Sequence, residues 1–179
     1  GRDRRRSRSR VGDEHPRRDR HEDDPQTREI DGTIPLGEEG DVNPKAIAAN
    51  GDDLWVGDEF DALVWQIDTS TGRITASPGL LSVPTAIAIG GGSVWVASRA
   101  GDLVTRIDPD TGRSSTIPVG DGPAGIAVGF GSVWVANGAE GTVSRIDIPR
   151  GGVAETIDLG AAPEGVAIGS DDVWVSVPV

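Results

Sequence analysis

The stretch GDGPAG at residues 120–125 has the G-x-G-x-x-G spacing with which a glycine-rich turn cradles a dinucleotide pyrophosphate. That chemistry needs a strand before the turn and a helix after it. The segment that follows, GIAVGFGSVWVANG, is rich in glycine and valine and lacks helical apolar spacing, which favours strands. The corresponding turns GAAPEG, LSVPTA and DVNPKA keep only the proline. We therefore expect an ordinary turn here and an accidental match to the motif.

Other residue types that carry chemistry are sparse. The only two histidines, His15 and His21, lie in the charged N-terminal segment, so no Ser-His-Asp set can be assembled beyond it. The chain has no cysteine, which excludes disulfides and thiolate metal sites. The Asp108-Pro-Asp110-Thr-Gly112 stretch could offer oxygens to calcium but lacks a bidentate Glu, and we interpret it as an Asx-type turn. We predict no catalytic residue, no metal ligand and no cofactor.

The body of the chain is periodic, with proline and tryptophan recurring at spacings of 40, 39 and 40 residues and aspartate at spacings of 40 and 39. The distance from proline to tryptophan is always 11 residues, and the distance from tryptophan to aspartate is always 13. Only the stretch from aspartate to the next proline varies in length, so an adjustable loop lies there. The recurring positions are Pro44, Pro84, Pro123 and Pro163; Trp55, Trp95, Trp134 and Trp174; and Asp68, Asp108 and Asp147.

Each unit offers four short strands, for example residues 125–128, 133–136 and 143–147, with a fourth such as 115–119. Four antiparallel strands in about 40 residues is the period of a propeller blade. We predict an all-β β-propeller with about three and a half blades present, in repeats near 44–83, 84–122, 123–162 and 163–179. A β-solenoid is the less favoured alternative.

The order of strands predicts an incomplete ring. GTIPLG at residues 32–37 resembles the fourth-strand segments STIPVG and ETIDLG, whereas the chain ends on a second strand, VWVSVPV. Since closure takes four to eight blades, we expect residues 29–179 to be a piece of a longer propeller with exposed strand edges.

The four repeat tryptophans, Trp55, Trp95, Trp134 and Trp174, could stack against sugars or quinones. Their fixed place in a VWV strand instead favours a structural core between blades. Trp65 differs, because the matching positions hold threonine and serine, and we expect it to pack at an edge.

Charge divides the chain. Residues 1–28 hold ten arginines against seven acidic residues, whereas the remainder is strongly acidic and the whole chain has a net charge of −12. The segment 1–28 is almost without apolar side chains, and we predict a disordered Arg-rich linker or tail. The acidic body argues against nucleic-acid binding by the propeller, since phosphate contacts need Lys and Arg. No run of about 18 apolar residues is present, so we predict no membrane span in this chain.

Over about residues 30–179 the motifs PxGIAxGxGSVWVA and GTVxRID, followed by a turn of the P-x-T-G type, resemble the repeats of streptogramin (virginiamycin B) lyase-like propellers. They also resemble the wider NHL and YVTN propeller group. The resemblance implies a bacterial propeller, commonly of six or seven blades, and an extracytoplasmic or cell-surface location.

In the lyase, the resemblance implies a catalytic histidine just after a repeat proline, with a divalent cation nearby. The corresponding positions here are Lys45, Thr85, Ala124 and Glu164. None is histidine, so lyase activity has no support in these blades, although further blades could carry the missing residues.

The loops that lead into the first strand and out of the second vary between repeats while the scaffold is constant, as expected where loops carry function. The candidate ligand-binding residues on this face are Lys45, Asp58, Glu59, Thr85, Arg99, Asn137, Glu140 and Glu164. We expect a non-catalytic binding or scaffold module for an unknown protein, peptide or small molecule. The alternative is a lyase-like or lactonase-like enzyme whose metal and base lie in blades absent from this chain.

Overall fold

The computed structural model describes residues 33–36, 42–76 and 79–178. Residues Ile34–Val179 form a compact unit of their own, and everything below concerns that unit. The predicted tail at residues 1–28 lies outside the described residues. The described residues contain strands and turns and no helix, so nothing among them forms a helix that could cross a membrane.

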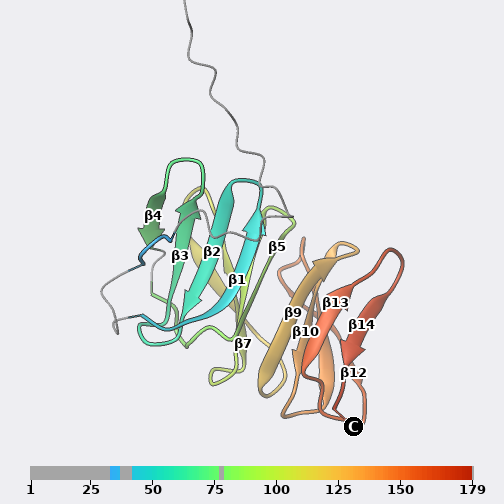
Figure 1. The fold of residues 1–179 in the computed structure, drawn as a ribbon. Coiled ribbons are helices and arrows are strands. Elements are labelled where there is room, and N and C mark those ends of the chain that lie inside the picture. The colour runs from blue at the N-terminus through green and yellow to red at the C-terminus, as the bar shows by residue number, and fades with distance from the viewer. Residues whose placement is uncertain (1–32, 37–41, 77–78, 179) are drawn as a thin grey trace, which may run out of the picture. The chain divides into compact units, whose positions relative to one another are not determined.

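Among the described residues, fourteen strands form three four-stranded sheets and one two-stranded sheet, all antiparallel (Figure 1). Blade 1 contains β1 (Pro44–Asn50), β2 (Asp53–Asp58), β3 (Leu63–Asp68) and β4 (Arg73–Ala76). Blade 2 contains β5 (Ala86–Gly90), β6 (Ser93–Ser98), β7 (Leu103–Ile107) and β8 (Ser114–Pro118). Blade 3 contains β9 (Pro123–Gly129), β10 (Ser132–Asn137), β11 (Thr142–Asp147) and β12 (Gly152–Asp158). Blade 4 contains β13 (Gly165–Ile168) and β14 (Val173–Ser176).

Within each sheet the strands are neighbours in the order in which they occur in the chain. The same register recurs, because the alanine of the first strand pairs with the repeat tryptophan of the second, as in Ala48↔Trp55, Ala88↔Trp95 and Ala127↔Trp134. This arrangement confirms the predicted β-propeller blades. One expected strand is absent, since residues 33–36 of the GTIPLG segment have no strand structure.

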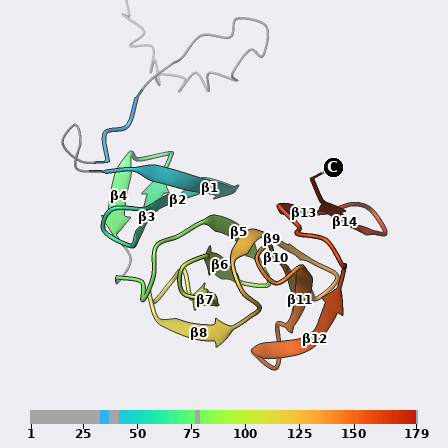
Figure 2. The same cartoon turned by 90° about the horizontal axis from the view of Figure 1, so that it is seen from below.

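The first strands of the blades follow one another: β5 contacts both β1 and β9, and β9 also contacts β13. Figure 2 shows these first strands close together, with the fourth strands β8 and β12 at the outside. The approach is close enough to require glycine. A Cβ atom added to Gly90 would lie 2.6 Å from Val128 Cγ1, and one added to Gly125 would lie 2.9 Å from Gly165 Cα. Crowding between successive first strands therefore explains their small side chains.

Two buried clusters connect the blades, and each contains one repeat tryptophan. Trp55 packs in a cluster with Ile87, Val94 and Val96 of blade 2. Trp95 packs in a cluster with Ile126, Val133 and Val135 of blade 3. In both cases the indole of one blade is covered by the first two strands of the next, which is the dominant apolar contact of the fold.

The expected core role does not extend to all four tryptophans. Trp95 is fully buried, Trp134 is half-buried and Trp174 is 66% exposed. The physical reason is that each indole depends on the blade that follows it. Trp134 faces a blade of only two strands, and no described strand follows β14. Trp174 as a core residue is therefore a correction to the sequence prediction.

Hydrogen bonds define the turns between the third and fourth strands. Asp108 Oδ1 accepts the backbone N–H groups of Asp110 and Thr111, at 3.0 and 2.9 Å, and Gly112 adopts a φ of 68°. Asp68 Oδ1 accepts the hydroxyl and the N–H of Ser70 and the N–H of Thr71 in the same way. The predicted Asx-type turn is confirmed. The GDGPAG stretch is also a turn, which passes directly into β9 rather than into a helix.

Tryptophan burial gives a graded stability prediction. Trp95→Ala should lower the free energy of unfolding by about 3–5 kcal/mol, because it removes a fully buried aromatic ring. Trp134→Ala should cost less, because that indole is only half-buried. Leu81→Ala, at a side chain 79% exposed, is the control and should stay within about 0.5 kcal/mol. Urea denaturation measures all three, and equal losses at Trp95 and Leu81 would contradict the blade contact described above.

The turn aspartates give a pH prediction. The backbone N–H of Thr111, followed by its hydroxyl, holds the pKa of Asp108 below its usual range, and the Ser70 hydroxyl, followed by Thr71, does the same for Asp68. A lowered pKa in the folded state stabilises the fold above the unfolded value of about 3.9, and this contribution disappears as the pH falls through the folded value. The stability advantage of wild type over Asp108→Asn should therefore shrink when the pH is lowered from about 6 to below about 3.

Denaturation curves at the two pH values measure this difference. Asp121→Asn is the matched control, because the Asp121 carboxylate accepts no hydrogen bond from the described residues, and it reports the effect of removing one negative charge from an acidic chain. An advantage of wild type over Asp108→Asn that stays constant with pH would contradict the prediction.

Candidate functional site

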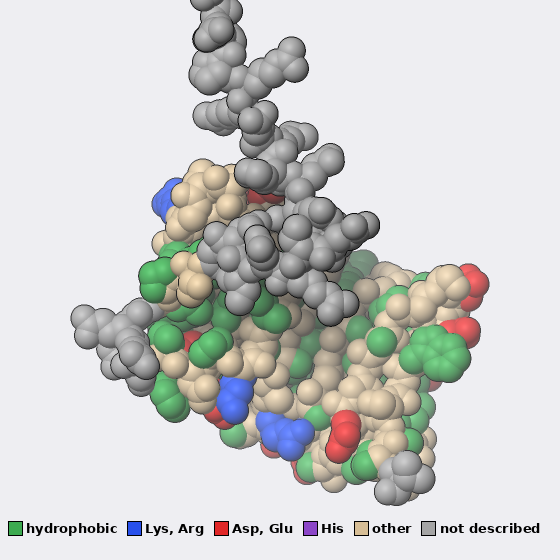
Figure 3. All heavy atoms as spheres, viewed as in Figure 1, with side chains coloured by type: hydrophobic (Ala, Val, Ile, Leu, Met, Phe, Trp, Pro, Cys, Tyr) green, Lys and Arg blue, Asp and Glu red, His purple; other side chains and the backbone are tan. Residues whose placement is uncertain are grey.

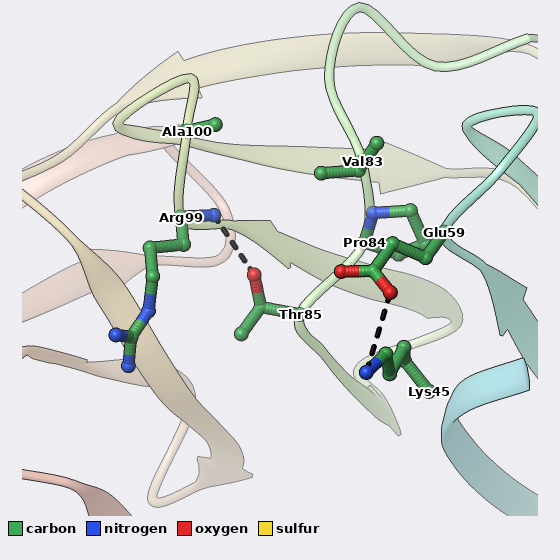
Figure 4. Close-up of a pocket in the computed structure, with 7 residues that line it drawn as sticks. All are labelled: Lys45, Glu59, Val83, Pro84, Thr85, Arg99 and Ala100. Atoms are coloured by element: carbon green, nitrogen blue, oxygen red, sulfur yellow. Dashed lines mark hydrogen bonds and ion pairs between the residues drawn. The ribbon is translucent and has the colours of Figure 1, made fainter. Parts of the chain in front are cut away.

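A hollow of about 370 Å³ lies where the loops at the ends of the strands of blades 1 and 2 meet. We call it the Arg99 hollow, and Figure 4 shows the residues that line it. Four of the eight residues predicted from the sequence lie together in it. The lining consists of Lys45, Glu59, Val83, Pro84, Thr85, Arg99 and Ala100.

Strand register explains why these four side chains meet. Lys45 follows the proline that opens β1, and Glu59 follows the end of β2, where Pro44 pairs with Asp58. Thr85 and Arg99 occupy the same two positions in blade 2, one before β5 and one after β6. The Thr85 N–H donates to the Ala97 carbonyl at 2.7 Å, which continues the ladder to the rim of the blade. Each blade therefore has two neighbouring loop positions at this end of its sheet, one after the repeat proline and one after the second strand. We call these the rim positions, and those of blades 1 and 2 border the hollow.

The pair from blade 1 is an ion pair. Lys45 Nζ lies 3.3 Å from Glu59 Oε2, and both side chains are partly exposed. Asn43 Nδ2 donates to the same carboxylate oxygen at 2.8 Å and helps to fix its position. The two opposite charges largely neutralise each other at this side of the hollow.

In the pair from blade 2, Thr85 and Arg99, the guanidinium of Arg99 has no partner with opposite charge. The Arg99 backbone N–H donates to Thr85 Oγ1 at 2.9 Å. The Arg99 guanidinium forms no hydrogen bond or ion pair with any described residue. In Figure 4 this guanidinium and the Lys45–Glu59 pair lie on opposite sides of Thr85. Val83, Pro84 and Ala100 add apolar surface to the hollow.

An arginine without an ion-pair partner, in a hollow that also contains apolar side chains, can bind a planar anion through its paired N–H donors while the rest of the ligand contacts the apolar side chains. The volume is within the range of small-molecule sites, about 300–1,000 Å³. Figure 3 shows basic and acidic side chains close to one another along one edge of the molecular face drawn there.

Two of the remaining predicted residues are buried and cannot reach a ligand at the surface. Asp58 is 1% exposed, and its Oδ1 accepts the N–H groups of Asn43 and Phe60, both at 3.0 Å. Asn137 is fully buried, and its Nδ2 donates to Thr142 and Ser144 at 3.0 and 2.8 Å. The described contacts assign both side chains to the support of loops.

The last two are exposed but lie outside the Arg99 hollow. Glu140 Oε2 accepts the Thr142 hydroxyl at 2.8 Å in blade 3. Glu164 follows the proline of blade 4, and its backbone N–H donates to the Ser176 carbonyl at 2.9 Å. The structure therefore brings four of the eight candidates together in the Arg99 hollow. Of the other four, Asn137 and Glu140 are connected through the Thr142 hydroxyl in blade 3, and Asp58 and Glu164 are not part of either group.

Within the described part of the chain, no three His, Cys, Asp or Glu side chains lie close enough to share a metal ion. Asp108 Oδ1 accepts two backbone N–H groups of the turn, which is the role of an Asx-turn aspartate. The two histidines of the sequence lie outside the described residues.

Sequence reasoning missed the arginines of the third strands. Arg106 pairs across the sheet with Trp95, and its guanidinium carbon lies 5.1 Å from the centre of that ring; Arg145 lies 6.0 Å from Trp134. Arg106 also borders a second, more polar hollow at the opposite ends of the strands of blade 2, together with Asp108 and Arg113. The RID motif of two repeats, in register with the tryptophan, carried the signal for these cation–π pairs.

Solved structures of other proteins contain the same fold. The sequence matches no protein-family profile, and no curated protein matches it. Among solved structures it is similar to the hydrazine synthase of Kuenenia stuttgartiensis, with 23% identity and a TM-score of 0.68 over 80% of this chain and 43% of that chain. It is also similar to virginiamycin B lyase from Staphylococcus aureus, with 21% identity and a TM-score of 0.69 over 79% of this chain and 51% of that chain.

The computationally designed Ika4 protein is a third similar structure, with 16% identity and a TM-score of 0.69 over 83% of this chain and 93% of that chain. This chain therefore spans about half the length of the two natural proteins and nearly the whole of the designed one. The expected resemblance to virginiamycin B lyase is confirmed at the level of fold, and this chain is built from β-propeller blades.

Proposed function

We propose that the protein is a non-catalytic β-propeller module that binds a small organic anion in the Arg99 hollow. The observation that carries the proposal is the guanidinium of Arg99, which has no hydrogen-bond or ion-pair partner among the described residues and lines the same hollow as Thr85, Val83 and Pro84. Planar bidentate recognition of a carboxylate is the interaction that arginine makes best.

The charges of the residues that line the hollow indicate the charge of the ligand. Glu59 already neutralises Lys45, so the hollow has one net positive charge, contributed by Arg99. A monoanion with an apolar body satisfies both the cation and the apolar side chains, whereas a cation would meet the unpaired guanidinium at a cost.

The binding test uses 4-phenylbutyrate as the probe and 4-phenylbutanamide as its neutral counterpart. Titration into ¹⁵N-labelled protein should shift the amide resonances of Thr85 and Arg99 with the carboxylate and much less with the amide. Arg99→Gln should weaken binding about tenfold or more, because charge-assisted hydrogen bonds contribute about 1.5–3 kcal/mol.

Arg150→Gln is the matched control, since Arg150 is an exposed arginine away from the hollow, and it should leave the affinity unchanged. Equal binding of the amide and the carboxylate, or an affinity that Arg99→Gln does not change, would refute the proposal.

The ion pair of blade 1 gives a prediction of opposite sign. Glu59→Gln keeps an oxygen acceptor for Asn43 but removes the charge that neutralises Lys45. The hollow then gains a second cation, so 4-phenylbutyrate should bind about two- to fivefold more tightly at low ionic strength, with the gain reduced by salt. The same ¹⁵N titration measures the effect, and unchanged or weaker binding by Glu59→Gln would contradict this prediction.

A further inference from the structure

Each four-stranded blade carries three polar residues on the same face of the sheet as its repeat tryptophan. The middle residue lies on the third strand, directly opposite the tryptophan, and its neighbours lie on the second and fourth strands. Residues opposite each other, or two positions apart along a strand, point to one face of a sheet. We call these three residues the polar row. The rows are Asp53, Gln66 and Thr75 in blade 1; Ser93, Arg106 and Ser115 in blade 2; and Ser132, Arg145 and Glu155 in blade 3.

In blades 1 and 3 the polar row contains its own carboxylate. Gln66 Nε2 donates to Asp53 Oδ1 at 3.2 Å in blade 1. In blade 3, Arg145 Nη2 lies 3.2 Å from Glu155 Oε2. The ion pair of blade 3 shows that an anionic group fits beside the arginine that covers the tryptophan ring, on the side of the fourth strand.

The polar row of blade 2 has the arginine but no carboxylate. Arg106 donates through Nε to Ser93 Oγ at 2.9 Å and through Nη1 to the Ile148 carbonyl at 3.4 Å. Its guanidinium also covers the Trp95 ring. None of these partners carries a charge, and Ser115 stands where blade 3 has its glutamate. The guanidinium is therefore held in place by neutral groups and has no counter-charge in its row.

A hollow of about 310 Å³ lies beside this guanidinium, and we call it the Arg106 hollow. The residues that line it carry no apolar side chain, in contrast to those of the Arg99 hollow. Blade 2 lies between two other four-stranded blades. Besides a glycine, the lining consists of Ser93, Arg106, Asp108, Arg113, Ser114 and Ser115.

Arg113 brings a second positive charge to the Arg106 hollow. Its side chain is exposed, and its guanidinium forms no hydrogen bond or ion pair with any described residue. The one acidic residue of the lining, Asp108, uses Oδ1 to bind the N–H groups of its own turn. Two guanidinium groups thus face one carboxylate in a chain of net charge −12.

The corresponding hollow of blade 1 has the opposite charge. Three aspartates and one arginine, Arg73, line it together with Gln66 and Thr75. Arg73 occupies the place of Arg113, since each directly follows the glycine of the turn between the third and fourth strands. An anion would meet repulsion in blade 1 and attraction in blade 2, so the two hollows of one scaffold differ in the charge of the ligand that they favour.

The arrangement of the donors in the Arg106 hollow indicates the shape of the anion. Guanidinium groups come from β7 and from the turn before β8, and serine residues border the hollow on β6 and β8. Donors on several strands suit a tetrahedral group, whose oxygens point in several directions, better than a flat carboxylate. The absence of apolar side chains from the lining also leaves nothing to bind the apolar body of an organic acid.

We propose that the Arg106 hollow binds the phosphate or sulfate group of a ligand, in the place that the Glu155 carboxylate occupies in blade 3. Arg106 is the fixed donor, and Arg113 is the exposed one that adds the second charge. This site and the Arg99 hollow lie at opposite ends of the strands of blade 2 and take different anions, so the failure of either proposal leaves the other intact.

Titration of inorganic phosphate into the ¹⁵N-labelled full chain, at neutral pH and constant ionic strength, tests this proposal. The amide resonances of Ser93 and Ser115 should shift and saturate, whereas those of Thr75 and Ser132, in the polar rows of blades 1 and 3, should not. A parallel titration with inorganic sulfate distinguishes the two sources of the group. Tighter binding of phosphate assigns the site to a phosphorylated ligand, and tighter binding of sulfate assigns it to a sulfated one.

Two pairs of variants identify the site. Arg113→Gln should weaken phosphate binding about threefold or more, whereas Arg73→Gln, which removes the same charge from the corresponding position of blade 1, should leave it unchanged. Ser115→Glu supplies the carboxylate that blade 3 already has and should abolish the phosphate-induced shift at Ser93. Ser115→Gln has the same size without the charge and should retain that shift.

The ¹⁵N spectrum of each variant also shows whether it is folded. Phosphate-induced shifts that spread evenly over the three blades would overturn the proposal. So would equal affinities of Arg113→Gln and Arg73→Gln, or a Ser115→Glu variant that binds phosphate as well as Ser115→Gln does.

Discussion

The fold depends on the packing of a tryptophan from one blade onto the first two strands of the next. Trp55 and Trp95 are buried in this way, each among isoleucine and valine side chains of the following blade. Hydrogen bonds and cation–π contacts strengthen the same position, since Trp95 Nε1 donates to the Gly90 carbonyl at 3.0 Å while Arg106 covers its ring. Because the contact joins neighbours only, stability accumulates along the chain one interface at a time.

Close packing at the first strands leaves the variable chemistry to the loops. Gly90, Gly125 and Gly129 lie so near the next blade that a Cβ atom would clash, and these positions cannot carry a functional side chain. The rim positions after the proline and after the second strand face no such limit. That is why Lys45, Glu59, Thr85 and Arg99 can differ between blades while the strands remain alike.

The sequence was sufficient to predict the blades, because their period follows from the register that each sheet must satisfy. It was insufficient for Trp174, whose repeat position is identical to that of Trp95 but whose neighbour is not. The candidate site was predicted in part for a related reason. Periodicity identifies the ends of strands, but only the structure shows that Asp58 turns inward to bond two N–H groups while Arg99 remains free.

Charge at the rim then distinguishes two blades of the same scaffold. In blade 1 the two adjacent positions hold lysine and glutamate, which satisfy each other. In blade 2 they hold threonine and arginine, and the hydroxyl is used by the backbone N–H of Arg99, so the guanidinium stays available. The binding site that we propose therefore needs no departure from the repeat architecture. It requires one pair of loop residues whose charges do not cancel, Thr85 and Arg99, next to a pair whose charges do cancel, Lys45 and Glu59. Val83 and Pro84 supply the apolar surface of the same hollow.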